Sequence, residues 1–173
     1  TAVTLNKKMP ARFAYTVTYS IGEPGSIHKS GTIYRLPIAD NDTCVVRTAT
    51  SPKVKDNFID TNTAYEILIK KGSSVVASRN GTVFNTHGSP DDPDNKEPSA
   101  IGNFVSILHD DGTWATYAWL ADESLLVKPG DQVKTGQAIA LSGSHPLSVE
   151  SYILFFVNQN IGRLKVRSIP VDI

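Results

Sequence analysis

The side chains of this chain that could do chemistry are few and widely spaced. Four histidines are present, at His28, His87, His109 and His145, together with a single cysteine, Cys44. Histidine suits metal binding and proton transfer, whereas a reactive cysteine suits nucleophilic attack. No nucleophile signature surrounds Cys44, and the chain offers it no partner for an internal disulfide. We therefore expect Cys44 to be a half-buried apolar thiol without a catalytic role.

One segment offers hard oxygen ligands. Residues 87–99 (H-G-S-P-D-D-P-D-N-K-E-P-S) are polar and acidic and contain three prolines. Asp91, Asp92 and Asp94 could bind calcium, but the prolines interrupt their spacing and the EF-hand pattern is absent. Such a segment buries too little apolar surface to offset its ordering entropy, so we expect an exposed loop.

The composition indicates a globular protein and excludes some partners. The chain has 173 residues, of which 40% are hydrophobic and 20% charged, with 17 basic and 17 acidic side chains. A net charge of zero provides no field to steer the protein onto nucleic acid or anionic lipid. The longest apolar run, over residues 152–157, is far shorter than the roughly 20 residues of a membrane helix. No signal peptide is visible, which fits a mature secreted protein, a cytosolic protein or a trimmed chain.

The elements that position these residues are predicted to be strands. The 12 glycines and 10 prolines fall at short intervals between β-branched and aromatic runs, a pattern typical of an all-β fold. No segment has a convincing helical period, and only residues 122–127 could form one helical turn. The predicted strands are 13–19, 31–36, 43–48, 64–69, 74–77, 81–84, 104–109, 113–118, 132–133, 138–141, 151–157 and 163–166.

A weak internal echo links two parts of the chain. Residues 71–77 and 129–135 each combine a glycine-bearing turn with a short strand, and each is followed by a further glycine and an apolar strand. This layout indicates a sandwich folded from two pseudo-equivalent hairpins. Biotinyl and lipoyl carriers share it, but Val133-Lys134-Thr135 does not match their lysine tripeptides, so a swinging-arm role is not expected.

Three blocks of residues carry a specific family resemblance. Residues 102–120 follow the pattern N-x-V-x-I-x-H-x-D-G-x-x-x-x-Y-x-H-L, and residues 127–143 follow V-x-x-G-D-x-V-x-x-G-Q-x-I-x-x-S-G. Residues 64–81 match a series A-x-D-F, G, V, A, G. In these blocks the chain resembles LytM/lysostaphin-type peptidoglycan endopeptidases. The resemblance as a whole covers roughly residues 50–173. The resemblance implies a duplicated-hybrid-motif, barrel-sandwich-like antiparallel β-sandwich over residues 49–173, with a small β-rich N-terminal extension over residues 1–48 packed on it.

The resemblance also implies that a zinc site has been lost. The family binds one zinc ion through a His and an Asp of an early H-x(n)-D pair and the second His of a late H-x-H. Here Glu66 stands at the Asp position, and no histidine occurs between His28 and His87. Trp119 stands where Y-x-H-L has its His, whereas Tyr152 and Leu154 replace the two histidines of H-x-H. A catalytic zinc needs about three protein ligands, and leucine and tryptophan offer no lone pair for one.

The replaced positions predict a vestigial groove that could still contact a ligand. Its residues would be Glu66, Tyr117, Trp119, Tyr152, Leu154 and His145. The aromatic side chains, with Phe155, would either plug the old cleft or form an aromatic floor for a sugar or peptide. Asp110-Asp111-Gly112-Thr113 is typical of a hairpin turn.

The remaining histidines are expected to be structural or solvated. His109 is predicted to be a turn histidine bonded to the backbone, and His28 and His87 to lie in solvated loops. A relocated metal site of His145, Glu66 and His87 is the alternative.

The sequence thus favours a pseudoenzyme of a zinc peptidase family, without a catalytic residue, metal or cofactor. We expect a periplasmic or secreted domain that binds peptidoglycan or an envelope protein, by analogy with degenerate relatives that activate cell-wall amidases. An active zinc endopeptidase with relocated ligands and a purely structural module of a secretion or assembly machine are the alternatives.

Overall fold

The protein is built from ten β-strands. The computed structural model describes residues 17, 19, 21–22, 24–29, 31–50, 54, 59–88, 99–143 and 151–173, and these contain strands and turns but no helix. The predicted all-β class is therefore confirmed. The strands are β1 (Val45–Thr48), β2 (Tyr65–Leu68), β3 (Ser74–Val76), β4 (Gly81–His87), β5 (Phe104–Leu108), β6 (Trp114–Ala118), β7 (Gln132–Val133), β8 (Ala138–Leu141), β9 (Tyr152–Asn160) and β10 (Val166–Ile169).

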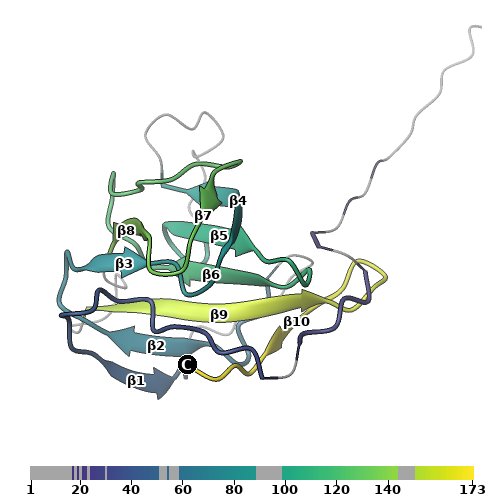
Figure 1. Ribbon diagram of the computed structural model, residues 1–173, viewed down its shortest axis with the longest axis horizontal. Coiled ribbons are helices and arrows are strands. Elements are labelled where there is room, and N and C mark those ends of the chain that lie inside the picture. The colour runs from purple at the N-terminus through teal and green to yellow at the C-terminus, as the bar shows by residue number, and fades with distance from the viewer. Residues whose placement is uncertain are drawn as a thin grey trace, which may run out of the picture.

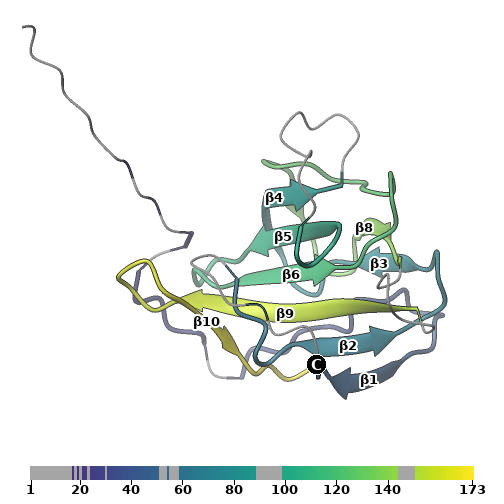
Figure 2. The same ribbon diagram turned by 180° about the vertical axis from the view of Figure 1, so that it is seen from behind.

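Eight of these strands form one antiparallel sheet: seven follow in the order β1-β2-β9-β6-β5-β4-β7, and the eighth, β10, pairs with β9 beside this path (Figure 1). β9 is nine residues long and buried throughout. Along one edge it pairs first with β2 and then with β10, and along its other edge it pairs with β6. The long central strand is visible across the whole molecule from both sides (Figures 1 and 2). β9 therefore fixes the register of both halves of the sheet.

The two echoing units of the sequence pair crosswise. β3 and β4 belong to the first unit, and β7 and β8 to the second. β3 pairs with β8 in a separate two-stranded sheet, whereas β4 pairs with β7 at the edge of the large sheet. Each unit thus supplies one strand to each sheet, which is how two short hairpins enclose a common core.

The buried apolar residues form two clusters. The first contains Tyr34, Tyr117 and Phe155 and extends to Val75 and Ile139 of the small sheet. The second contains Trp119, Tyr152, Leu154 and Phe156. Because side chains alternate along a strand, β9 places Phe155 in the first cluster and its two neighbours in the second.

The segment before β1 packs against the rest of the molecule. Tyr34 is fully buried in the first cluster, and its backbone N–H donates to the carbonyl of Asp172. The Arg35 N–H donates to the carbonyl of Ser78, and Ile38 forms an isolated bridge with Val75. These residues cross the core between the small sheet and the C-terminal strand.

Several sequence predictions need correction. Residues 31–36 form no strand but only a single bridge at Ile33. Residues 163–166 are largely a turn, in which Arg163 and Leu164 have φ values of 53° and 56°, and β10 begins only at Val166. Residues 122–127 form a turn and no helix, since Glu123 has a φ of 52°.

Other predictions are extended or not covered. β4 runs on to His87, so the acidic loop begins later than expected, and residues 89–98 lie outside the described residues. The strand predicted over residues 13–19 lies outside them too, apart from Val17 and Tyr19. In the part of the chain that the structure describes, no helix is long and apolar enough to cross a membrane.

Candidate functional site: the face around Glu66

Four neighbouring strands place Glu66 and Leu154, two residues of the predicted vestigial groove, in one row across the sheet. Glu66 of β2 lies opposite Arg47 of β1 on one side and opposite Leu154 of β9 on the other. Leu154 in turn lies opposite Ala118 of β6. Directly opposite residues in an antiparallel pair project to the same face, with Cβ atoms about 4.5–5.5 Å apart. The side chains of this row therefore share one face of the sheet.

Glu66 is a buried carboxylate that an arginine neutralises. Its side chain is 5% exposed, and its Oε2 accepts a hydrogen bond of 2.6 Å from Nε of Arg47. Arg47 itself is 48% exposed, so its guanidinium reaches from solvent onto the carboxylate. An ionised carboxylate of this burial needs a partner charge or several donors. Arg47 meets that need for a residue that the sequence predicts to stand at a metal-ligand position.

Leu154 and Trp119, which the sequence predicts to stand at the positions of two family histidines, place hydrocarbon and indole on this face. Leu154 is completely buried, and Trp119 is 7% exposed. The indole packs directly on Gly102, where an added Cβ would lie 2.5 Å from Cε3 of Trp119. Gly102 is also in the left-handed region, with φ at 64°. Only glycine satisfies both conditions, so this glycine makes room for the tryptophan.

The backbone of Trp119 is strained. Its φ is 59°, a value that bulky side chains rarely adopt. Hydrogen bonds hold it in place: its N–H donates to the carbonyl of Ile101 over 3.3 Å, and its carbonyl accepts from Gly143 over 3.0 Å. Backbone strain of this kind is concentrated at functional positions in proteins. Trp119 therefore has the strained backbone of a functional position, although its side chain offers no atom that binds a metal.

Tyr152 completes the apolar filling of this face. It is 5% exposed and lies in the second cluster with Leu154 and Phe156. Burial, followed by the nearby charge of Glu66, raises the pKa of Tyr152. Such low exposure of Trp119 and Tyr152 favours the plug interpretation over an aromatic floor, because a stacking platform must present a ring face to solvent.

The structure does not place every predicted groove residue on this face. It brings Glu66, Trp119, Tyr152 and Leu154 together, but Tyr117 lies in the first cluster, on the opposite face. There its hydroxyl accepts a hydrogen bond of 2.7 Å from the backbone N–H of Ser78, and burial raises its pKa. Alternation along β6 puts Tyr117 on the opposite face from Ala118, and the left-handed φ of 59° at Trp119 breaks the alternation that would otherwise place Trp119 beside Tyr117. His145 lies outside the described residues.

The residues around Glu66 do not fit a zinc ion. The oxygen that would bind the metal is already hydrogen-bonded to a cation, and the side chain opposite it is leucine. Among the described residues, no group of three or more His, Cys, Asp or Glu side chains could hold a metal. Zinc requires about three N, O or S donors around one point.

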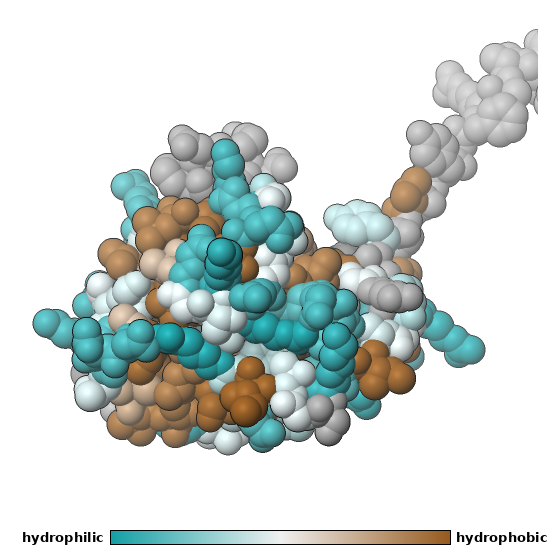
Figure 3. All heavy atoms as spheres, viewed as in Figure 1, coloured by the Kyte–Doolittle hydropathy of each residue, from teal (hydrophilic) through white to brown (hydrophobic). Residues whose placement is uncertain are grey.

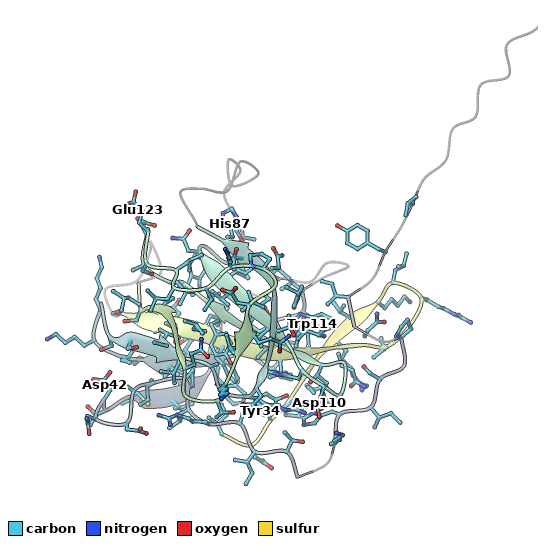
Figure 4. All side chains as sticks on the ribbon, turned by 45° about the horizontal axis from the view of Figure 1, so that its top comes forward. Tyr34, Asp42, His87, Asp110, Trp114 and Glu123 are labelled. Carbon is cyan, nitrogen blue, oxygen red and sulfur yellow. The ribbon has the colours of Figure 1, made fainter. Side chains whose placement is uncertain are left out.

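His87 does not lie near Glu66 either. His87 pairs with Phe104, and Phe104 with Ala118, so four strand spacings separate His87 from Glu66. At about 4.8 Å each, these spacings amount to roughly 19 Å. Figure 4 shows His87 at the upper end of the molecule, away from Tyr34 and Asp110. The described part of the chain therefore lacks the His87–Glu66 half of the relocated site.

Two of the histidine predictions are wrong and one is confirmed. His87 stacks on Phe104 with 5.8 Å between ring centroids, and half-buried His28 lies 3.5 Å from the Asp111 carboxylate. His87 lies in β4 and not in a loop, whereas His28 lies in a loop as predicted but is largely buried, with its side chain 20% exposed. His109 is bonded to the backbone as predicted, through Nδ1 and the carbonyl of Asn80 at 2.8 Å. Burial lowers the pKa of His109 to about 4.

A polar cluster at the β5–β6 hairpin was not foreseen. The hairpin turn itself is confirmed, with Gly112 at φ 79°. The Asp111 carboxylate accepts from the hydroxyl of Thr113 at 2.6 Å and from Nη1 of Arg79 at 2.8 Å. Burial alone would raise the pKa of Asp111, but these hydrogen bonds hold it well below its usual range. The turn motif predicted the hairpin, but Arg79, 32 residues away, carries no pattern that links it to the turn.

Comparison with known proteins assigns the chain to a family. The model of Peptidase family M23 matches residues 60–165, and the chain belongs to this family. A mutant catalytic domain of the prophage-encoded M23 protein EnpA from Enterococcus faecalis is 19% identical, with a TM-score of 0.55 over 79% of this chain and 94% of that one. A zinc-containing peptidase from Vibrio cholerae is 22% identical, with a TM-score of 0.53 over 79% of this chain and 39% of that one.

A third similar structure is the SpoIIQ–SpoIIIAH pore-forming complex. It is 22% identical, with a TM-score of 0.54 over 79% of this chain and 87% of that one. No curated protein matches the sequence. At these identities the structural likeness establishes the shared fold, and the predicted LytM/lysostaphin-type architecture is confirmed.

Proposed function

We propose that this protein is a non-catalytic M23 domain of the bacterial envelope, periplasmic or secreted, which binds peptidoglycan or scaffolds a cell-wall hydrolase or another envelope protein. The observation that carries the proposal is the ion pair between Arg47 and Glu66, with Leu154 on the opposite side of the carboxylate. A fixed guanidinium satisfies Glu66 electrostatically, so no metal ion is needed to stabilise this carboxylate.

The same pair argues against metal-assisted hydrolysis at this face. A bound zinc lowers the pKa of its water and polarises the scissile carbonyl, which requires the metal and an open coordination position. Here Leu154 and Trp119 contribute no atom that can bind a metal ion, and both are buried in the second cluster. The chain retains the fold that presents the groove and has replaced the atoms that would react.

A partner-binding role agrees with the known relatives in two ways. One similar structure is a complex, that of SpoIIQ with SpoIIIAH, so a domain of this fold can assemble with another protein. Others are peptidases such as the antimicrobial peptidase lysostaphin from Staphylococcus simulans. By family membership we infer for this chain a location in the envelope and an affinity for cell-wall components.

Metal content and peptidoglycan cleavage test the non-catalytic half of the proposal. The purified protein is incubated with zinc, desalted and analysed for metal, then mixed with purified sacculi, with lysostaphin treated in parallel. We expect substoichiometric zinc and no release of soluble fragments. Stoichiometric zinc together with release of fragments would establish the alternative, an active endopeptidase with relocated ligands.

Co-sedimentation tests the binding half. The protein is mixed with sacculi and centrifuged, and in parallel it is used to capture hydrolases from an envelope extract. Retention on sacculi, or capture of a cell-wall hydrolase, supports the proposal. Failure in both assays would contradict it and leave a purely structural module.

A further inference from the structure

β1 is an exposed strand at the end of the large sheet. It comes first in the strand order, and the described residues pair it only with β2. All four of its residues are exposed, with Val45 at 63% and Val46 at 40% of their accessible surface. In Figure 3 a hydrophobic area occupies the lower left of the molecule, where Figure 1 shows β1. Natural proteins usually protect such an edge, because its free backbone groups can pair with another chain.

The outward-pointing backbone groups of β1 can be identified. The N–H of Ala49 donates to the carbonyl of Ala64 over 2.8 Å, directly after the β1–β2 register that ends at Thr48 and Tyr65. In an antiparallel ladder, hydrogen-bonded pairs alternate with non-hydrogen-bonded pairs. The backbone groups of Val45 and Arg47 therefore face β2, whereas those of Val46 and Thr48 face outward, in position to bond an added strand.

A pocket lies beside the start of this edge. It has a volume of about 430 Å³ and is open to solvent. Cys44, Val45, Leu68 and Ile69 give it an apolar lining, and Lys70 stands at its margin. Such a pocket accepts one apolar side chain of a strand that pairs with β1.

The charge at this margin is positive and uncompensated. Lys70 and Lys71 are both exposed, and neither forms an ion pair with a carboxylate in the described part of the chain. An incoming segment with an acidic group next to its apolar side chain would match both features. Charge complementarity of this kind selects the partner and sets the register.

We propose that β1 binds an extended segment of a partner protein, which adds to the sheet as an antiparallel strand, inserts an apolar side chain beside Cys44 and Val45, and places a carboxylate against Lys70. In this mode of recognition the main-chain hydrogen bonds supply affinity, and the side-chain pocket supplies specificity. The site is separate from the face around Glu66, so it goes beyond the proposed function and does not depend on whether that face binds metal.

A second copy of this chain fits the edge less well. Twofold antiparallel pairing of β1 with itself would centre on Val46 and set Arg47 of the second copy opposite Val45. Because Val45 lies beside Lys70 in the pocket, this register brings two positive charges together. Like charges in such proximity oppose association.

A short acidic peptide tests the proposal by NMR. The probe is an N-acetylated, C-amidated octapeptide of alternating threonine and valine that carries one phenylalanine and, two residues later on the same face, one aspartate near its C-terminal end; it is titrated into the whole 173-residue chain. We expect the amide signals of Val46 and Thr48 to shift and their hydrogen exchange to slow severalfold, while the amides of β7, at the other end of the sheet, are unchanged.

Two variants separate the main-chain and the charge contributions. Val46→Pro removes an outward N–H that the β1–β2 ladder does not use, so the fold is kept, and we expect about fivefold weaker binding, with Val46→Thr as the control. Lys70→Glu should weaken binding of the acidic peptide severalfold and strengthen binding of the same peptide with lysine in place of aspartate. The proposal is supported when both variants remain folded and bind the acidic peptide more weakly, as measured by smaller shifts of the amide signals.

Three outcomes would overturn it. The first is the absence of any shift at Val46 and Thr48 at millimolar peptide. The second is equal binding of both peptides by Lys70→Glu, which would remove the charge requirement. The third is a concentration-dependent dimer that Val46→Pro abolishes, which would make a second copy the occupant. None of these results bears on zinc content or sacculus cleavage, so failure here leaves the proposed function standing.

Discussion

Two carboxylate–guanidinium pairs in this molecule look alike locally and differ in their surroundings. Glu66 with Arg47 and Asp111 with Arg79 have N–O distances of 2.6 and 2.8 Å, and both carboxylates are buried, at 5% and 2% exposure. Arg47, however, is 48% exposed, whereas Arg79 is 14% exposed. The first pair lies on the face where the sequence predicts a lost metal site, and the second joins the turn between β3 and β4 to the β5–β6 hairpin.

The difference between the pairs lies in how many groups depend on each carboxylate. Asp111 also accepts hydrogen bonds from the hydroxyl and backbone N–H of Thr113 and lies 3.5 Å from His28. Arg79 also donates to the Tyr34 hydroxyl over 3.4 Å. Removal of Asp111 would therefore leave several buried donors unsatisfied. In the described part of the chain the Glu66 carboxylate accepts from Arg47, which is half exposed to water, so this pair neutralises a charge without organising the fold.

The largest expected effect is the loss of Asp111. Asp111→Ala should lower the free energy of unfolding by about 3–5 kcal/mol, because it removes the buried carboxylate that accepts from Nη1 of Arg79 and from the Thr113 hydroxyl, although Nη2 of Arg79 keeps its bond to exposed Asp110. Urea unfolding followed by fluorescence of the two tryptophans measures the change. The control is Asp110→Ala, whose carboxylate is 69% exposed. Equal losses in both variants would show that the network adds nothing to a surface pair.

Acid should weaken the same region of the molecule next. His109 lies against the Tyr34 ring and near Arg79, Asp110 and Asp111, and its pKa in the folded protein is about 4 against 6.5 in the unfolded chain. Because burial disfavours the protonated ring, the stability it contributes is complete above pH 6.5 and is lost as the pH falls through 4. The difference corresponds to about 3 kcal/mol. Asp111, whose pKa is also lowered, adds a further loss below pH 4.

Comparison with His109→Asn isolates this contribution. The asparagine amide nitrogen takes the place of Nδ1, so it can still donate to the carbonyl of Asn80, and it cannot become protonated in this range; the unfolding free energy of the variant should therefore fall less steeply between pH 6.5 and 4. The free energy of unfolding is measured by urea titration at half-unit steps of pH. Identical slopes for the two proteins would mean that another group titrates in this window.

The sequence predicted the sheet better than it predicted these polar clusters. Alternating apolar residues in β5 and β6 and the D-D-G-T turn identify a hairpin locally, and the block from residue 127 to 143 identifies the second unit. The side-chain partners come from strands far apart in the chain: Arg79 is 32 residues from Asp111, and Arg47 is 19 from Glu66. Register across several strands decides such contacts, and no local pattern encodes it.

The candidate site shows the same division. Motif positions alone predicted that Trp119, Tyr152 and Leu154 stand on one face with Glu66, and the structure brings these residues together. That Arg47 meets Glu66 could not be predicted in this way, because β1 pairs with β2 through backbone hydrogen bonds that any sequence makes. The sequence placed Tyr117 in the same groove as Trp119. In the structure the alternation of side chains along β6 and the left-handed backbone at Trp119 put these two residues on opposite faces of the sheet.

The Glu66 pair should respond asymmetrically and more weakly. Arg47→Met leaves a buried carboxylate without its cation and should cost about 1–3 kcal/mol of unfolding free energy, whereas Glu66→Leu leaves a half-exposed arginine in water and should cost less. The double variant should be as stable as the wild type or more so. Chemical unfolding of all four proteins completes a double-mutant cycle. A double variant that loses the sum of both single effects would show that the two residues do not act as a pair.

The smallest effect is expected at the rim of the Asp111 cluster. Lys29 donates to Asp110 over 3.2 Å, but both side chains are well exposed, at 64% and 69%. Water screens such a pair, so Lys29→Ala should change the free energy of unfolding by less than about 0.5 kcal/mol, and 1 M salt should remove even that change. Thermal unfolding at low and high salt measures it. A loss as large as that of Asp111→Ala would mean that the rim and the buried pair form one cooperative unit, and the contrast between isolated and networked carboxylates would then rest on Glu66 alone.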